Sequence, residues 1–480
     1  MRRFVIAGAP ALLAASFVIT VYADTGTVLY ELPRALAGTV VIAFLAQAIG
    51  MAASRSVSAG SLIALAVVSV AIDFRAAVVV LVGAGAWEWS RRATRTSELS
   101  GGIALFVVIM FVVSVARAAS SNAFELTDLP RSLNGGSANQ SGGPDIYLIW
   151  LDGYPRSDTL AKFGYDNSWF VSDLTERGFH VATESTTNYP FTGQVLATVM
   201  NMKHIQQIDA LVPVPDTDVE QLRALSLAIN RNPVLSTLEE RGYWTVSTGL
   251  AEVRGTMRDV DQYLDAGEVR LWERQVMQRT SLWPVLCDAI VIPQHRSLIE
   301  STFRNIQAVA GTARPDPTFL FAHVMSPHTP IVFGRGGGAP EVRASGGCEV
   351  QFAINAEIIG LDETAYGQAM ADQVHYLNTR TITAVDQILA GSPDALVLVF
   401  SDHGARFTPA PSDEWFHTFF AARTPGYDGL FGDTPRPIEI FPKLFGAYFG
   451  LSYATPEDRS FISATGGIVR LLDVVPWPSP

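Results

Sequence analysis

The amino-terminal quarter of the chain is dominated by apolar residues, and the pattern changes after residue 118. Five apolar stretches are separated by short polar segments that contain arginine. They cover residues 4–23, 35–53, 60–72, 76–89 and 103–116. A helix needs about 20 apolar residues to cross a bilayer core of about 30 Å. The pattern therefore predicts about five membrane-spanning helices, although the short third and fourth stretches could form one re-entrant or hinged pair.

The arginines around these stretches predict the orientation of the bundle. With the amino terminus inside, the cytoplasmic arginines are Arg2, Arg3, Arg55, Arg91, Arg92 and Arg95, and the outer ones are Arg34, Arg75 and Arg117. This excess of positive charge inside predicts a multi-pass plasma-membrane protein whose remaining residues are extracytoplasmic. Residues 1–23 also fit a cleaved signal peptide, but the apolar run is long for one and further stretches follow it.

A polar segment separates the apolar region from the rest of the chain. Residues 119–143 are rich in Ser, Asn and Gly, which is typical of a flexible linker. The pattern therefore predicts a transmembrane domain over 1–118, a linker over 119–143 and an extracytoplasmic domain over 144–480.

In the third region, strand-like apolar runs alternate with helical patterns. The predicted strands are 146–151, 244–247, 319–325 and 396–400, and the predicted helices are 169–177, 192–202, 234–241 and 374–389. Such alternation predicts an α/β domain, with a mostly parallel central sheet between helices.

Two of the predicted strands end in an acidic residue. Asp152 follows the run IYLIWL, and Asp402 with His403 follows LVLVF. The carboxyl ends of parallel strands meet at one edge of a sheet, where α/β enzymes bind substrates. Between these segments, Thr192 lies near the start of a predicted helix. Each feature alone is common, since Asp-Gly often forms a turn and Thr often caps a helix. Together they predict a metal-centred site for phosphoryl or sulfuryl transfer.

These three segments resemble the alkaline phosphatase and sulfatase superfamily, most closely its membrane-anchored branch. That branch includes lipoteichoic acid synthase and the lipid A phosphoethanolamine transferases. The resemblance runs from about Pro144 to about Ser463. It implies an alkaline-phosphatase-like fold, a nucleophilic Thr192, and one divalent ion, Mn²⁺, Mg²⁺ or Zn²⁺. The ligands it implies are Asp152, Thr192, Asp402 and His403.

Neighbouring residues refine this resemblance. Sulfatases need Pro two residues and Arg four residues after the position of Thr192 to form formylglycine, but Gln194 and Leu196 stand there. Thr192 is therefore expected to act as an unmodified hydroxyl. In the loop SPHTP, His328 resembles a family histidine that contacts the phosphate or leaving group, whereas His323, within a strand, is expected to be structural.

Further residues are candidates for the surroundings of the site. Arg406 and His417 are expected to line it and bind the substrate. Asp413 and His417 do not complete a second metal set, so one metal ion is preferred. Cys287 and Cys348 are the only cysteines, and either a disulfide or two buried thiols would fit them.

The net charge of −12 argues against nucleic acid as a partner. The expected function is the transfer of a phospho-head group, of the phosphoglycerol or phosphoethanolamine type, through a phosphothreonine intermediate. The expected donor is a membrane phospholipid and the expected acceptor is an envelope glycan or lipid. Two alternatives are a phosphodiesterase or sulfatase-like hydrolase that uses the same site, and a non-catalytic envelope assembly module.

Overall fold

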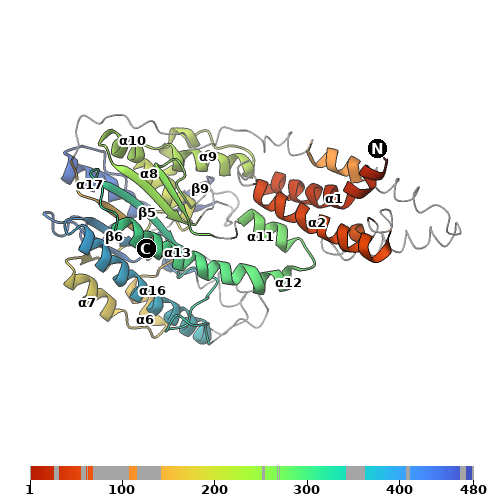
Figure 1. Cartoon of the computed structure of the whole chain (residues 1–480). Helices are drawn as coiled ribbons and strands as arrows, with labels where there is room; N and C mark the ends of the chain where they lie inside the picture. The colour runs from red at the N-terminus through yellow and green to blue at the C-terminus, as the bar shows by residue number, and fades with distance from the viewer. Residues whose placement is uncertain are drawn as a thin grey trace. The chain divides into compact units, whose positions relative to one another are not determined.

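The chain forms two compact units in a computed structural model. The first unit comprises Met1–Leu129 with Val269–Val291, and the second comprises Pro130–Glu268 with Ile292–Pro480. The structure describes residues 2–25, 32–55, 61, 63–68, 107–115, 142–250, 255–267, 269, 271–341, 363–406, 411–464 and 472–477 (Figure 1). Residues 269–291 lie within the range 144–480 that the sequence predicts for the extracytoplasmic domain, and they fall in the first of these two units.

The first unit contains two long helices, α1 (Arg2–Thr25) and α2 (Leu32–Ser54). They correspond to the first two apolar stretches; parts of the third and fifth are also helical, at 63–68 and 107–115, and the fourth lies outside the described residues. Within the parts of the chain that the structure describes, no helix has the length and apolar character needed to cross a membrane. The five crossings stay a prediction.

The same unit includes a helical segment from the middle of the chain. It consists of α11 (Leu271–Gln278), α12 (Trp283–Leu286) and a π-helical turn at Cys287–Val291. The buried Cys287 is disulfide-bonded. Cys348, the only other cysteine, lies outside the described residues.

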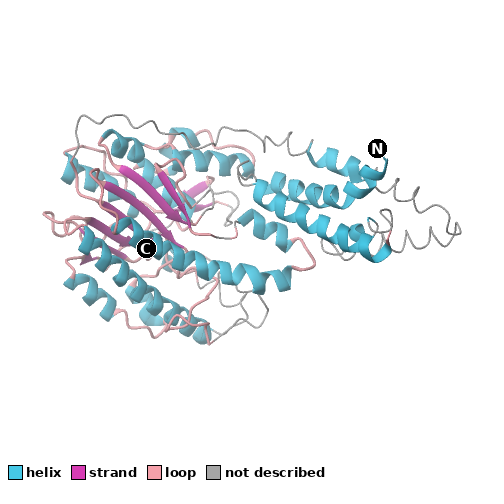
Figure 2. Cartoon of the chain, viewed as in Figure 1, coloured by secondary structure: helices cyan, strands magenta, loops and turns pink. Residues whose placement is uncertain are grey.

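The second unit is built around a seven-stranded sheet of order β2-β7-β6-β1-β5-β3-β4 (Figure 2). The strands are β1 (Ile146–Leu151), β2 (His180–Val181), β3 (Trp244–Gly249), β4 (Gln262–Asp265), β5 (Thr318–Val324), β6 (Leu396–Phe400) and β7 (Phe420–Arg423). Strands β4, β3, β5, β1 and β6 pair in parallel, and β7 and β2 add an antiparallel edge. The predicted α/β fold with a mostly parallel sheet is confirmed. Strands β8 (Phe461–Ser463) and β9 (Val474–Pro476) form a separate hairpin pair.

Helices cover both faces of this sheet. They are α6 (Ser157–Lys162), α7 (Ser168–Glu176), α8 (Thr192–Asn201), α9 (Asp218–Asn230), α10 (Pro233–Glu240), α13 (Ile292–Ala310), α16 (Glu363–Gly391) and α17 (Ile440–Phe449). Short 3-10 turns lie at Ile205–Gln207, Asp209–Leu211, Asp413–Trp415 and Pro437–Glu439.

Alternate side chains of β1 enter two different cores. Leu148 and Trp150 pack with residues of α8, α9, α10 and α17, whereas Ile149 and Leu151 pack with residues of α7, α13 and α16. Because successive residues of a strand point to opposite faces, a strand that is apolar throughout requires cover on both sides. The continuous apolar run IYLIWL is thus explained by burial of all six residues.

Candidate metal centre

Asp152 and Asp402 meet at one edge of the sheet because their strands are neighbours. Trp150 of β1 lies in register with Phe400 of β6, and each acid follows two residues later. Both carboxylates are buried, and the backbone N–H of Gly153 donates to Asp402 Oδ1 at 3.0 Å. The parallel register therefore brings together two acids that lie 250 positions apart in the chain.

The ring of His403 has its proton placed by the backbone. Its Nδ1 lies 2.8 Å from the carbonyl oxygen of Gly404, which can only accept, so Nδ1 carries the hydrogen. At the other side of the ring, Nε2 lies 2.7 Å from Arg406 Nη2, which can only donate. The hydrogen-bond network thus leaves a lone pair on Nε2, the form in which histidine binds metals.

With this tautomer, the lone pair of His403 Nε2 lies close to carboxylate oxygens of Asp152 and Asp402. Asp152 Oδ1 is 3.3 Å from His403 Nε2, and Asp402 Oδ2 is 3.7 Å from the same nitrogen. Neither carboxylate oxygen accepts a hydrogen bond from any described residue, although both are buried. Buried carboxylate oxygens without a donor are costly, and such groups normally pair or bind metal. The arrangement therefore fits a bound cation.

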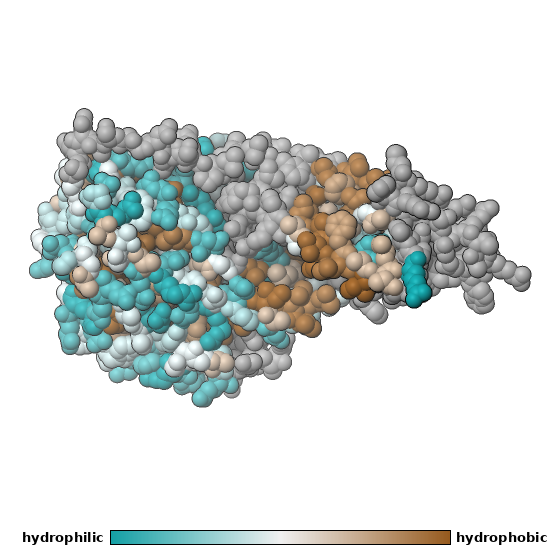
Figure 3. Space-filling view, viewed as in Figure 1, coloured by the Kyte–Doolittle hydropathy of each residue, from teal (hydrophilic) through white to brown (hydrophobic). Residues whose placement is uncertain are grey.

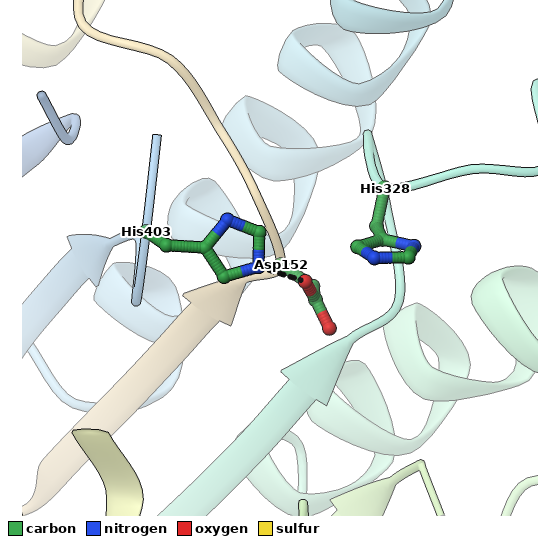
Figure 4. Close-up of side chains that lie close together, drawn as sticks. All are labelled: Asp152, His328 and His403. Carbon is green, nitrogen blue, oxygen red and sulfur yellow. Dashed lines mark ion pairs between the residues drawn. The ribbon is translucent and has the colours of Figure 1, made fainter. Parts of the chain in front are cut away.

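His328 brings another ring nitrogen to the same place (Figure 4). Its Nδ1 donates to the carbonyl oxygen of Thr329 at 2.8 Å, which leaves Nε2 as the acceptor. Its backbone N–H donates to the carbonyl oxygen of Asp152 at 2.9 Å and so fixes the loop beside β1. Potential ligand atoms of Asp152, His328 and His403 all lie within 4.8 Å of one another. Carboxylate and imidazole ligands suit Zn²⁺ and Mn²⁺, and carboxylates also suit Mg²⁺.

His323 supports this site from the adjacent strand β5. Its Nε2 lies 3.1 Å from Asp152 Oδ2, and its Nδ1 donates to the carbonyl oxygen of Gly255 at 2.6 Å. Burial opposes a charged ring, but the hydrogen bond from His323 to Asp152 and the nearby carboxylates outweigh it and raise the pKa of His323. Burial likewise disfavours the Asp152 anion, yet its pKa lies well below the usual range, and the hydrogen bond from the charged His323 ring is the cause that this network supports. Asp152 is therefore ionised.

Arg406 lies inside the cluster, as the sequence led us to expect of a residue that lines the site. Its Nη2 is also 3.2 Å from His328 Nε2, so one guanidinium nitrogen contacts two imidazoles. The guanidinium carbon lies 5.4 Å from the centre of the Phe191 ring. Phe191 is the N-cap of α8, which connects the cluster to the start of that helix.

Thr192 is the first residue of α8, where the sequence predicts it, and its side chain is partly exposed. Its hydroxyl forms no hydrogen bond with the residues that the structure describes. An N-cap role was the alternative for Thr192, but Phe191 takes that position. The role of Thr192 as nucleophile and ligand stays a prediction.

His417 contacts a different group of residues. Its Nδ1 lies 3.3 Å from Arg156 Nη2, and Arg156 forms a bidentate pair with Asp158. Among the residues described, no hydrogen bond or ion pair joins the His417 side chain to Asp152 or His403. The predicted substrate-binding role of His417 therefore has no support from a contact with the metal ligands.

Comparisons with known proteins find no matching family model and no matching curated protein. Among solved structures, the chain is similar to the C-terminal periplasmic domain of EcEptC from Escherichia coli in complex with Zn. The identity is 14%, the TM-score is 0.44, and 72% of this chain and 96% of that chain are covered.

The chain is also similar to the solved structures of two proteins that are named as enzymes. The soluble domain of lipooligosaccharide phosphoethanolamine transferase A from Neisseria meningitidis has 10% identity and a TM-score of 0.41, over 64% of this chain and 89% of that chain. Phosphonate monoester hydrolase of Agrobacterium radiobacter has 14% identity and a TM-score of 0.41, over 67% of this chain and 80% of that chain.

Proposed function

We propose that this chain is a metal-dependent transferase that moves a phospho-head group from a membrane lipid to an envelope glycan or lipid. The head group would be of the phosphoglycerol or phosphoethanolamine type. The observation that carries the proposal is the group of lone-pair atoms on Asp152, Asp402 and His403, which face one another with no hydrogen between them. A buried guanidinium and the start of a helix lie beside this group.

Asp152, Asp402 and His403 would hold one divalent ion, with the hydroxyl of Thr192 as a further ligand. A divalent ion in such a site lowers the pKa of a coordinated hydroxyl and offsets the charge of a phosphate. Zn²⁺, Mn²⁺ and Mg²⁺ are all compatible with these ligand types.

Thr192 would be the nucleophile. Its oxygen, after loss of its proton, forms a bond to the lipid phosphorus, and the bond from phosphorus to the lipid alcohol breaks. The alcohol takes up a proton and leaves, and the head group remains on Thr192 as a phosphodiester. An acceptor hydroxyl then attacks the same phosphorus and restores Thr192. The N–H groups at the start of α8 favour the negative charge of the phosphate.

His328 and Arg406 would act on the same phosphate. The Nε2 of His328 carries a lone pair, so it can accept the proton of an attacking hydroxyl and return it to a leaving one. Arg406 offers N–H donors of the kind that bind phosphate oxygens. The predicted amino-terminal spans would keep this unit beside its lipid donor, outside the cytoplasm.

The proposal is tested by trapping the intermediate. The purified full chain is incubated with phosphatidylglycerol or phosphatidylethanolamine vesicles without acceptor, and peptides are analysed by mass spectrometry. We expect an adduct on Thr192 whose mass identifies the head group. Thr192→Ala should lose adduct and lipid turnover, whereas Thr198→Ala, in the same helix, should keep both.

Two results would change the conclusion. Turnover by Thr192→Ala would contradict a covalent intermediate on this residue. An adduct that forms and is released to water at the same rate with or without glycan acceptors would make the protein a hydrolase with the same site.

A further inference from the structure

Arg406 occupies an unusual position between two potential metal ligands. Both His403 and His328 donate through Nδ1 to backbone carbonyls, so the lone pairs of both Nε2 atoms point at the same place. Arg406 Nη2 lies in that place, at 2.7 Å from His403 and 3.2 Å from His328. Arg406 is only 9% exposed, so it is largely shielded from solvent in this position.

A metal ion and the Arg406 guanidinium nitrogen cannot both bind the lone pair of His403 Nε2 at the same time. A metal bound to an imidazole lies about 2.0–2.1 Å from the nitrogen, along its lone pair. In the structure that lone pair accepts a hydrogen from Arg406. Two cations at such separation would also repel each other strongly in a buried site. One of them must leave.

We propose that Arg406 fills the metal position when the protein is metal-free and swings out when the metal binds. This inference rests on the proposed function, because it takes His403 as a ligand. In the metal-free protein the guanidinium offsets the buried charges of Asp152 and Asp402. When a divalent ion takes over that task, Arg406 is free to bind the phosphate near Phe191 and Thr192.

The inference is tested by metal affinity rather than by activity. Full-length protein stripped with EDTA is titrated with Zn²⁺ and with Mn²⁺ against a competing chelator. Arg406→Met and Arg406→Gln should bind both ions more tightly than wild type, by about tenfold or more in Kd. Both variants should also unfold at lower temperature than wild type without metal, and the difference should shrink in saturating metal. Arg335→Met is the control for a lost positive charge, because Arg335 is exposed and pairs loosely with Asp372 at 3.8 Å.

The outcomes separate the two proposals. If Arg406 merely supported the ligands, its loss would weaken metal binding by about 10–100-fold. Weaker or unchanged binding in the Arg406 variants, with tight binding in wild type, would overturn the inference and leave the proposed function standing. Absence of metal binding in every variant and in wild type would overturn both.

A second inference comes from the surface of the first unit. Most of the exposed large apolar side chains in the described residues belong to this unit, including Ile42, Leu45, Ile49, Val112 and Val113 of its amino-terminal part. The segment 269–291 adds three more, Leu282, Val285 and Ile290. Figure 3 shows the apolar surface of this unit in brown. Contiguous apolar patches of this kind mark surfaces that contact a partner or a membrane.

We infer that the segment 271–291 contacts lipid acyl chains together with the amino-terminal helices. Its exposed large apolar side chains are aliphatic, as are most of those on the helices of the same unit, and a lipid phase accepts such side chains without specific pairing. Arg279 precedes this apolar stretch and suits the head-group level, and Asp288 is an exposed charge within it. The segment would thus hold part of the middle of the chain at the membrane.

The test uses the full chain in phosphatidylglycerol and phosphatidylethanolamine vesicles that contain doxyl-labelled lipids. A bimane fluorophore is attached at Leu282→Cys or Val285→Cys, and at Val214→Cys or Tyr427→Cys as exposed controls in the second unit. We expect several-fold stronger quenching by doxyl lipids at the first two positions. Equal quenching at all four positions would contradict the inference. Labels at 282 and 285 that are shielded from water yet not quenched would assign the surface to a second copy of the chain.

Discussion

His323 and Asp152 form a buried pair across two adjacent strands, with His323 Nε2 3.1 Å from Asp152 Oδ2. His323 donates through its other nitrogen to Gly255, so the ring orientation is fixed from both sides. The pair occupies one oxygen of Asp152 and leaves Oδ1 directed toward His403. A group that orients a ligand in this way tunes metal affinity without touching the metal.

We therefore predict that His323→Gln weakens Zn²⁺ binding by about 10–100-fold, as measured by chelator competition. The amide cannot supply the charge that the imidazolium gives to Asp152. His180→Gln is the matched control, since His180 lies on the outermost strand β2 and forms an exposed pair with Asp433. Equal Kd values for wild type and His323→Gln would show that the pair only supports the fold.

Asp402→Asn should abolish metal binding and leave the metal-free protein at least as stable as wild type. The reason is that Asp402 Oδ2 is a buried anionic oxygen without a donor among the described residues. Replacing the charge by an amide removes that penalty, worth on the order of 1 kcal/mol or more, whereas Gly153 can still donate to Oδ1. Elemental analysis and urea unfolding of the EDTA-treated proteins measure the two effects.

A different aspartate provides the contrast. Asp261 Oδ2 accepts hydrogen bonds from both the backbone and the hydroxyl of Thr245. Asp261→Ala should therefore cost about 1 kcal/mol of stability and leave metal content unchanged. A loss of stability in Asp402→Asn as large as in Asp261→Ala would mean that the Asp402 carboxylate is structural.

The central strands could be predicted from the sequence because burial on both faces produces continuous apolar runs. The predicted 146–151 and 396–400 match β1 and β6, and 319–325 is within one residue of β5. The edge strand β7, with the sequence FAAR, has neither the length nor the pattern to distinguish it from a loop. It pairs antiparallel to β6, and that pairing depends on contacts distant in sequence.

The candidate site could be predicted in part because two of its acids follow strands that are recognisable as continuous apolar runs. Acids one or two residues after buried strands identified Asp152 and Asp402, but the contact between His323 and Asp152 depends on the register of β5 with β1. A signal existed, since His323 is the only ionisable residue in the strand TFLFAHV. The position of Arg406 between two rings could not be inferred, because it depends on the tautomers that Gly404 and Thr329 impose.

Gly404→Ala should disrupt the segment that carries Asp402 and His403. A Cβ at this position would lie 2.5 Å from the carbonyl oxygen of His417 and closer still to that of Glu414. Both are backbone atoms, so they cannot rotate away, and we expect a loss of about 1–3 kcal/mol in unfolding free energy with reduced metal affinity. Gly336→Ala is the control because a Cβ there meets no atom within 4 Å. Unaltered stability of Gly404→Ala would show that the loop moves freely.

The last prediction concerns pH and the buried residue His204, just beyond the carboxyl end of α8. Its Nδ1 accepts from the hydroxyl of Tyr189 at 3.1 Å, and its Nε2 donates to the carbonyl oxygen of Glu457 at 2.8 Å, which satisfies the neutral ring. Burial lowers the pKa of His204 below its ordinary value. Below the unfolded pKa of about 6.5, the unfolded chain binds more protons than the folded one, so acid removes stability and higher pH restores it.

Wild type should therefore keep its stability advantage over His204→Gln at pH 8 and lose part of it as the pH falls below about 6.5. The glutamine cannot protonate, and contributions from other groups cancel in the difference between the two proteins. Urea unfolding at several pH values, with metal absent, measures this difference directly. A constant difference across the range would mean that His204 is not held neutral. Because His204 lies three residues beyond the end of α8, the same loss should loosen the helix that presents Thr192.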